Sequence, residues 1–251
     1  MAAPVRYPQG VVDRESTHPL GMLPVLDPTK FYYFHDDFNA FVTAAAGVTG
    51  WHKDEVNAGT DPVVQDAAGG VIAFTLDNAD EDNQHYAWGT STTVHETVKL
   101  SPSKRAWLRT RFKVEDADKN IPIIGCHITQ DDPWNTEPSD QFLFRTLRAT
   151  PTALTFACGK TNSTEVTISL GATEDDTWVT VTAYYDGKGT IKAWRETDAG
   201  VITAQGSASV TSSTVGDLLP DTEMGVAFGM EAMDTGTDVM SIDFITVIVE
   251  R

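Results

Sequence analysis

The feature that most constrains the fold is a succession of short apolar runs separated by turn-forming residues. Residues 178–185 (WVTVTAYY) and 190–195 (TIKAWR) are rich in β-branched and aromatic side chains, and Asp186-Gly187-Lys188-Gly189 separates them. Glycine adopts the positive φ that tight hairpin turns require, so these runs predict a β-hairpin. Further runs of this kind are residues 71–76, 94–100, 107–114, 121–128, 141–148, 153–158, 165–170, 224–230 and 239–249. Short strands repeated in this way predict an all-β sandwich or barrel.

Alternation within the runs indicates which faces are buried. Residues 107–114 alternate apolar and basic side chains, which predicts one core face and one solvent face carrying Arg109, Arg111 and Lys113. Residues 239–249 are apolar on both alternations, so they predict a mid-sheet strand that is covered on both faces. The predicted sides are Met240, Ile242, Phe244 and Ile248 on one face and Ile245, Val247 and Val249 on the other. No run predicts a convincing amphipathic helix, and the best candidate is residues 38–46.

Length and charge limit the classes of function. A chain of 251 residues can bury roughly 70–75% of its unfolded surface, so it needs no disulfide or metal to be stable. The net charge of −18 argues against broad nucleic-acid binding, because the phosphate backbone would be repelled. No stretch approaches the ~18 apolar residues of a membrane span, so we expect no membrane partner either.

The cysteines and the first residues bear on where the chain is made. Cys126 and Cys158 lie in apolar strand-like runs, which predicts buried reduced thiols, with a bridge between neighbouring strands as the alternative. The first residues, MAAPVRYPQG, contain no apolar segment of the kind found in secretory signals. We therefore expect synthesis in a cytoplasm.

Residues 1–30 differ from the rest of the chain, because they hold five of its 12 prolines. This composition predicts an extended arm, followed by a β domain over residues 31–251. An arm this rich in proline cannot form a core of its own, so the domain surface, a sister subunit or a larger assembly would have to hold it. Its candidate anchors are Val5, Tyr7, Val11, Val12, Leu20, Met22 and Leu23.

Residues 97–114 form a basic strip in an otherwise acidic chain. The strip contains no acidic residue and holds Lys99, Lys104, Arg105, Arg109, Arg111 and Lys113. One interpretation is a docking face for an acidic neighbour, including another copy of the chain, with Arg109, Arg111 and Lys113 as interface candidates. The other is an outward strand face that pairs with neighbouring Asp and Glu side chains.

Candidate ligand-binding residues lie in loops. The acidic loops around Asp80 and Asp82 and around Asp131 and Asp132 offer oxygen ligands that suit calcium, although solvated loops have the same composition. Trp134 stands between Pro133 and Asn135, where an aromatic ring could contact a glycan or anchor the loop.

Histidine and cysteine offer no recognisable catalytic or zinc-binding pattern. His35, His85 and His95 lack the companions at short spacing that a zinc site needs. Cys126 and His127 are neighbours in a predicted strand, so their side chains should point to opposite faces. We therefore expect no catalytic residue and no cofactor.

The order of several short motifs resembles a known superfamily. After the arm come Tyr32-Tyr33-Phe34-His35-Asp36-Asp37-Phe38, Trp51, a Gly-Gly-Val-Ile run at 69–72, the RTRFKV run at 109–114 and the closing IDFITV run at 242–247. Over residues 34–251 this order resembles the concanavalin A-like lectin/glucanase (laminin-G-like) jelly roll, in particular virion structural proteins of tailed bacteriophages. The resemblance implies a two-sheet antiparallel jelly-roll sandwich.

The same resemblance gives the expectation about enzymatic activity. Glucanases of the superfamily carry Glu-x-Asp-x-x-Glu on a strand, which supplies the carboxylates of a retaining mechanism. The nearest matches here are Glu174-x-Asp176 and Glu196-x-Asp198, and both lack the third carboxylate. We therefore expect a protein that is not an enzyme.

The function implied by the resemblance is structural. The expected protein is a capsid decoration (cement) protein of a bacteriophage, located on the virion surface after synthesis in the host cytoplasm. Its partners would be the major capsid protein and copies of itself in a homotrimer. The alternative is a carbohydrate-binding, lectin-like module for glycans of the host surface.

Overall fold

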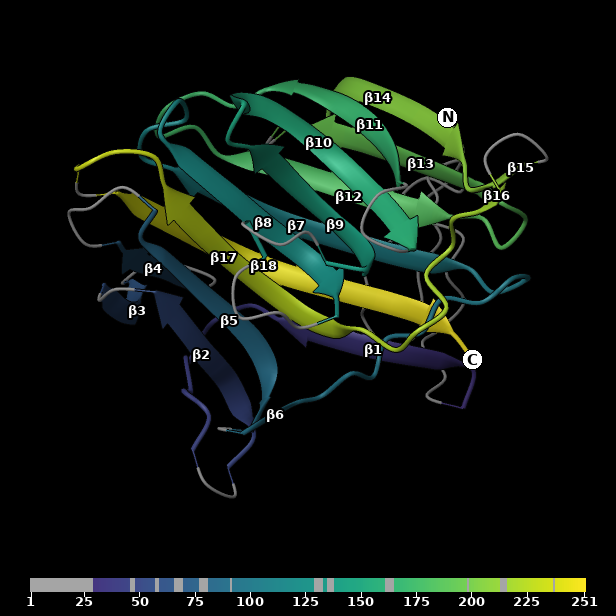
Figure 1. The fold of residues 1–251 in the computed structure, drawn as a ribbon, viewed down its shortest axis with the longest axis horizontal. Coiled ribbons are helices and arrows are strands. Elements are labelled where there is room, and N and C mark those ends of the chain that lie inside the picture. Colours follow the sequence, from purple (N-terminus) through teal and green to yellow (C-terminus); the bar gives the residue numbers. More distant parts are fainter. Residues whose placement is uncertain are drawn as a thin grey trace.

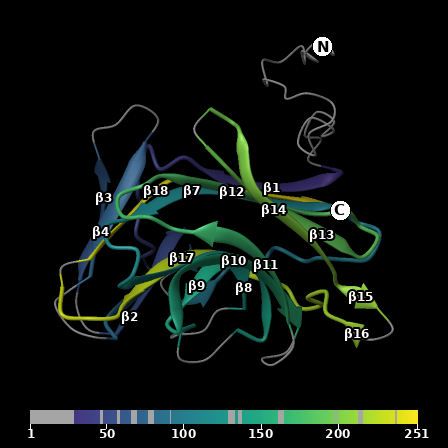
Figure 2. The ribbon, with the colours of Figure 1, turned by 90° about the horizontal axis from the view of Figure 1, so that it is seen from above.

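Two antiparallel sheets pack face to face in the computed structural model (Figure 1). The structure describes residues 29–45, 48–56, 59–65, 70–76, 81–90, 92–128, 133–134, 138–160, 165–197, 199–212, 216–236 and 238–251. The predicted arm up to residue 28, with all of its anchor candidates, lies outside the described residues, as do Asp80, Asp131 and Asp132. Figure 2 shows the sheets edge-on as two layers.

The first layer, sheet A, contains the closing strand of the chain. Its order is β14 (Ile202–Ser209), β13 (Thr190–Glu196), β12 (Val179–Tyr185), β7 (Ala106–Val114), β18 (Val239–Glu250), β4 (Val71–Thr75) and β3 (Thr60–Gln65). β1 (Phe31–Asp36) pairs with β18 beyond the end of β4. This arrangement confirms that the closing strand lies in the middle of a sheet.

The second layer, sheet B, joins strands from both halves of the chain. Its order is β11 (Glu165–Ala172), β10 (Thr150–Lys160), β9 (Asp140–Leu147), β8 (Asn120–His127), β17 (Gly225–Ala232), β5 (Asn83–Thr90) and β2 (Gly50–Val56), with β6 (Thr93–Val94) beside β5. A separate ribbon pairs β15 (Thr211–Ser212) with β16 (Gly216–Asp217). The all-β, two-sheet jelly-roll prediction is confirmed.

The predicted hairpin is β12–β13. Gly187 and Gly189 have φ values of 73° and 99°, which other residues rarely adopt. The Asp186 carboxylate closes the turn, because it accepts hydrogen bonds from the backbone N–H groups of Lys188 (2.7 Å) and Thr190 (3.0 Å).

Strand β18 departs from the predicted faces because its register shifts between Ile242 and Phe244. A bulge of this kind adds one residue and reverses the alternation beyond it. The core-facing side chains are therefore Met240, Ile242, Ile245, Val247 and Val249. The assignment of Phe244 and Ile248 to the face of Ile242 was wrong. Ile248 instead packs against Phe31 and Trp107 on the outer face of sheet A.

Other sequence predictions need correction. Residues 94–100 were expected to form a strand, but only Thr93–Val94 pairs with β5, while Val98 makes an isolated bridge to Met224. Alternation reports which side chains are buried, here Val98 and Leu100, and does not report whether a neighbouring strand is present. The strands β2, β3, β5 and β14 were missed because polar residues dominate them. Among the described residues no helix occurs, as expected, and the best helical candidate is not helical over its described part, residues 38–45.

The core between the sheets is densely aromatic at one point. Phe228 of β17 lies 4.7 Å from Trp51, 5.2 Å from Tyr86, 5.7 Å from Phe38 and 6.0 Å from Phe74, measured between ring centroids. These rings come from β2, β4, β5 and the segment after β1, so Phe228 holds both sheets together. Buried aromatic pairs at such distances add to the stabilisation from area burial.

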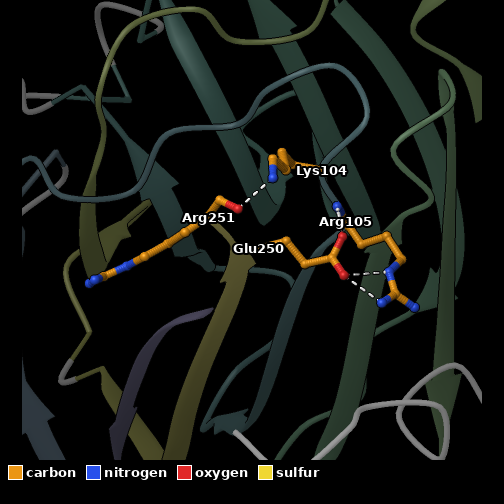
Figure 3. Close-up of polar contacts among 4 residues, drawn as sticks. All are labelled: Lys104, Arg105, Glu250 and Arg251. Carbon is orange, nitrogen blue, oxygen red and sulfur yellow. Dashed lines mark hydrogen bonds and ion pairs between the residues drawn. The ribbon is translucent and has the colours of Figure 1, made fainter. Parts of the chain in front are cut away.

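The carboxyl end of the chain is fixed to sheet A by charge (Figure 3). Glu250 Oε1 accepts a hydrogen bond from Arg105 Nε at 2.9 Å, and Glu250 Oε2 accepts one from the Arg105 backbone N–H at 2.8 Å. The guanidinium lowers the pKa of Glu250. Lys104 Nζ also donates to the backbone carbonyl of Arg251, so the residues before β7 are joined to the residue after β18.

Candidate functional site

The outer face of sheet B has a floor of small residues along β17. Gly225, Ala227 and Gly229 alternate with core residues of that strand, so no bulky side chain rises from its outer face between Gly225 and Gly229. His85 on β5 and His127 on β8 flank β17 and reach across it. Their Nε2 atoms are 3.1 Å apart, within hydrogen-bonding distance. A buried pair of imidazoles therefore lies on this face.

The hydrogen bonds assign the protons of this pair. His127 Nδ1 lies 2.8 Å from the Ile128 carbonyl, which can only accept, so Nδ1 carries the hydrogen. In neutral His127 the Nε2 atom is then an acceptor, and His85 Nε2–H donates to it. His85 Nδ1 is left buried without a hydrogen-bond partner among the described residues. Burial lowers the pKa of His127 to about 4, and burial with the neighbouring His127 and His52 lowers the pKa of His85 well below its usual value.

Trp134 lies against this pair. Its Nε1–H donates to the Ile121 carbonyl at 2.9 Å, and its ring centroid is 6.3 Å from that of His85 in a T-shaped arrangement. A Cβ on Gly229 would lie 2.8 Å from Trp134 Cη2, so only glycine admits the indole here. Trp134 also packs against Ile123, Leu143 and Ala157. These contacts agree with the interpretation in which Trp134 anchors its loop.

Charged side chains beside Trp134 form two compensated groups. Arg145 Nη2 donates to Glu165 Oε1 at 2.6 Å, and Gln141 Nε2 donates to Glu165 Oε2 at 2.8 Å. Arg148 Nη2 donates to Glu231 Oε1 at 3.0 Å. Both arginines present planar, fixed hydrogen-bonding forks, and neither adds net charge to the site.

Trp134 and these ion pairs line a hollow of about 400 Å³. Its lining residues are Ile121, Ile123, Pro133, Trp134, Arg145, Thr146, Leu147, Arg148, Glu165 and Glu231. Arg148 is accessible, with 40% of its side chain exposed, whereas the Glu231 side chain is 6% exposed. The volume is typical of a small-ligand site, with an aromatic wall and convergent polar groups. Sequence reasoning found Trp134 and missed the others, because β8, β9, β11 and β17 assemble the site only in the folded chain.

The part of the basic strip that forms β7 lies on the opposite sheet, and its three cations are paired there. Each interface candidate pairs with a carboxylate and lies over an aromatic ring: Arg109 with Glu196 (3.0 Å) and Phe244, Arg111 with Asp243 (2.7 Å) and Trp178, and Lys113 with Asp176 (2.8 Å) and Trp178. The structure thus shows the pairing with Asp and Glu, and docking by this face stays a prediction.

The carboxylates of the two partial glucanase motifs differ in their surroundings. Glu174 and Glu196 line a common hollow of about 630 Å³. Glu196 is buried, and Arg109 and Trp194 Nε1 donate to its oxygens. Asp176 pairs with Lys113, and Asp198 lies outside the described residues.

The described calcium candidate and the two cysteines are buried. Asp82 is 2% exposed, and its Oδ1 has no hydrogen-bond partner among the described residues. No three His, Cys, Asp or Glu side chains within the described ranges are placed to hold a metal ion. Cys126 and Cys158 are free and buried, as predicted, and burial raises the pKa of both thiols. Cys126 faces the core while His127 faces outward, which confirms their opposite orientation.

Structural comparison finds solved structures with a similar fold. A protein of unknown function from Shewanella oneidensis MR-1 is similar with a TM-score of 0.56 and 13% identity, over 88% of this chain and 87% of that chain. The CBM2 module of the evolved Dit of Lactobacillus casei BL23 phage J-1 is similar with a TM-score of 0.53 and 10% identity, over 87% and 96%. The binding domain of botulinum neurotoxin serotype C1 gives 0.50 and 12%, over 79% of this chain and 44% of that chain.

At these identities the similarities show the fold alone. No family model matches the sequence, and no curated protein matches it. Within the part of the chain that the structure describes, no helix has the length and hydropathy of a membrane span.

Proposed function

We propose that this chain is a carbohydrate-binding module whose glycan occupies the hollow beside Trp134. The observation that carries the proposal is an aromatic ring next to two arginine–glutamate forks in a single hollow on the sheet face. Sugar hydroxyls pair with such planar donors and acceptors, and the apolar face of a sugar ring packs on aromatic carbon. The fold similarity to a phage CBM2 module supports the class.

The hollow has buried polar groups at its base and exposed side chains at its rim. Arg145 and Glu231 are nearly buried, so their positions are fixed before a ligand arrives. Arg148 and Leu147 are exposed and can meet the ligand from solvent. Fixed polar groups lower the ordering cost of binding, which favours recognition of a rigid sugar ring.

Removing the aromatic wall is expected to weaken glycan binding strongly. A glycan array screened with the full chain identifies the ligand, and titration calorimetry then measures its affinity. We expect Trp134→Ala to weaken binding more than tenfold and Arg148→Ala to weaken it about fivefold, because each removes a contact to the sugar. Trp178→Ala, on the outer face of sheet A, is the matched control and should bind normally. Unchanged affinity in folded Trp134→Ala, or no ligand on the array, would remove the proposal.

A role in a virion is the second candidate. We infer a non-enzymatic capsid decoration protein that contacts the major capsid protein and copies of itself in a homotrimer. The outer face of sheet A favours it, because this face carries half-buried cations on aromatic rings and lies opposite the hollow. Tyr33 on the same sheet is 48% exposed. Assembly through sheet A would leave the hollow free for a glycan on the host surface.

Deleting residues 1–30 tests the assembly role. Light scattering on the full chain should give the mass of a trimer, and the shortened chain should give that of a monomer, because the arm would carry the anchors. The shortened chain should also lose binding to capsids while it keeps its β circular dichroism. Equal masses and equal capsid binding in the two chains would contradict the decoration role.

A further inference from the structure

The buried histidine pair lies directly against the aromatic wall of the hollow. We propose that His85 and His127 position Trp134 and release it in mild acid, so that the hollow binds glycan at neutral pH and loses it as the pair is protonated. This inference rests on the proposed function, because it concerns regulation of the same site. Neither histidine lines the hollow itself, so both are positioning residues.

The contacts leave the pair little freedom. His85 is 0% exposed and His127 is 1% exposed, and a hydrogen bond between the Nε2 atoms joins them over the glycine floor of β17. Trp134 stands edge to face with His85 and covers Gly229. Any movement of His85 away from His127 therefore changes the surface on which the indole rests.

Among the described residues, no acceptor is in place for an added proton on this pair. Protonation of His127 at Nε2 would set two N–H groups against each other at 3.1 Å. Protonation of His85 at Nδ1 would create a buried donor without a partner among the described residues. Either charge must reach water to be stabilised, because an isolated charge in a protein interior is costly. Trp134 stands against His85, so its displacement is one change that would admit water to the pair.

Among the side chains that the structure describes, the carboxylates nearest the pair are already held in ion pairs, and the Asp54 side chain lies outside that set. From β2, His52 lies close enough to His85 to lower the pKa of His85 further, and the register places Asp54 opposite His85 on that strand. β17 offers only glycine and alanine on the floor, and beyond it Glu231 is paired with Arg148. On the β9 and β11 side, Glu165 is paired with Arg145.

Linkage gives the direction and the pH window. The pKa of His127 is about 4 in the closed state, below the ordinary 6.5, so protons bind more tightly to an opened, hydrated histidine than to the closed one. The contribution of His127 to the closed state, in which Trp134 rests against the pair, is fully present above pH 6.5 and is lost as the pH falls from 6.5 towards 4. Between pH 7.5 and pH 5, His127 alone shifts the equilibrium towards opening by about 30-fold. His85 shifts it further in the same direction.

The position of Trp134 can be followed without any glycan. The difference in emission and acrylamide quenching between the wild-type chain and Trp134→Phe isolates the signal of this indole. We expect this signal to become more quenchable between pH 7.5 and pH 5. The same difference, taken in the His85→Gln/His127→Gln background, should stay flat, because glutamine pairs there without titrating. His95→Gln is the matched control and should behave as wild type. The protein is kept at micromolar concentration, because its net charge is small at pH values near the sequence pI of about 4.5 and proteins associate more readily there.

Affinity for the glycan identified on the array is then measured over the same range. We expect the wild-type affinity to fall about tenfold between pH 7.5 and pH 5 and the double variant to lose less than about twofold. A flat Trp134 signal in wild type overturns the inference, and this result does not depend on whether the double variant folds. Movement of Trp134 with unchanged affinity also overturns it. Movement of Trp134 in a protein that binds no glycan at pH 7.5 leaves the positioning role intact and removes only the proposed function.

Discussion

Replacing Phe228 with alanine is expected to lower the free energy of unfolding by about 3–5 kcal/mol, as for other buried Phe→Ala changes. Phe228 is 0% exposed and touches aromatic rings from both sheets, so its loss leaves a cavity that neither sheet can close. Urea denaturation followed by circular dichroism measures the change.

Two controls define this result. Tyr33→Ala removes an aromatic ring that is 48% exposed, so it should cost far less than Phe228→Ala. Phe228→Leu keeps most of the volume and should cost about half as much as Phe228→Ala. Equal stability of Phe228→Ala and wild type would show that the two sheets are not held together at this point.

Replacing Glu196 with alanine is expected to cost about 3 kcal/mol, the second largest effect among these variants. Glu196 is 3% exposed and accepts hydrogen bonds from Arg109 Nη2 at 3.0 Å and Trp194 Nε1 at 2.6 Å. Its removal leaves a guanidinium, 20% exposed, and an indole N–H without these acceptors. Urea denaturation midpoints, multiplied by one m-value shared by both proteins, give the change in the free energy of unfolding.

The neighbouring pair on the same sheet provides the comparison. Arg111 and Asp243 are 23% and 21% exposed, so water can replace Asp243 in Asp243→Ala, and we expect a cost of about 1 kcal/mol. The double variant Arg109→Met/Glu196→Gln should recover much of the loss, since replacing both members of a buried pair costs less than removing one. A double variant as unstable as Glu196→Ala would contradict this account, because glutamine still offers an acceptor to Trp194 Nε1.

The sequence predicted the fold well where the signal is local. The hairpin at Asp186-Gly187 and the alternation of β7 follow from the conformational freedom of glycine and from the pleat of a strand. The faces of β18 were predicted wrongly, because the bulge after Ile242 is a property of pairing with β7. The strand β5 was missed because its polar residues read as a loop, although all of them from Asn83 to Ala87 are buried.

The candidate site was predicted only in part. Trp134 stood out because proline and asparagine flank it, and the sequence left open whether it anchors a loop or meets a glycan. His85 was set aside because nothing at short spacing accompanied it, yet its partner His127 lies 42 residues away. The alternation of Gly225, Ala227 and Gly229 was the available signal, since it marks a strand whose outer face is bare.

By itself the sequence determined that this chain is an all-β sandwich with buried thiols and a core-facing side on β7, because turn residues and period-two alternation act between near neighbours. Only the tertiary structure decided what lies on the outer faces. Arg109 and Arg111 of the basic strip became members of neutral ion pairs, because β18 places Asp243 beside β7 and β13 places Glu196 across β12 from it. The histidine pair and the hollow exist because β17, from the far end of the chain, inserts between β5 and β8. Strand order brings together residues distant in sequence, and no local pattern encodes it.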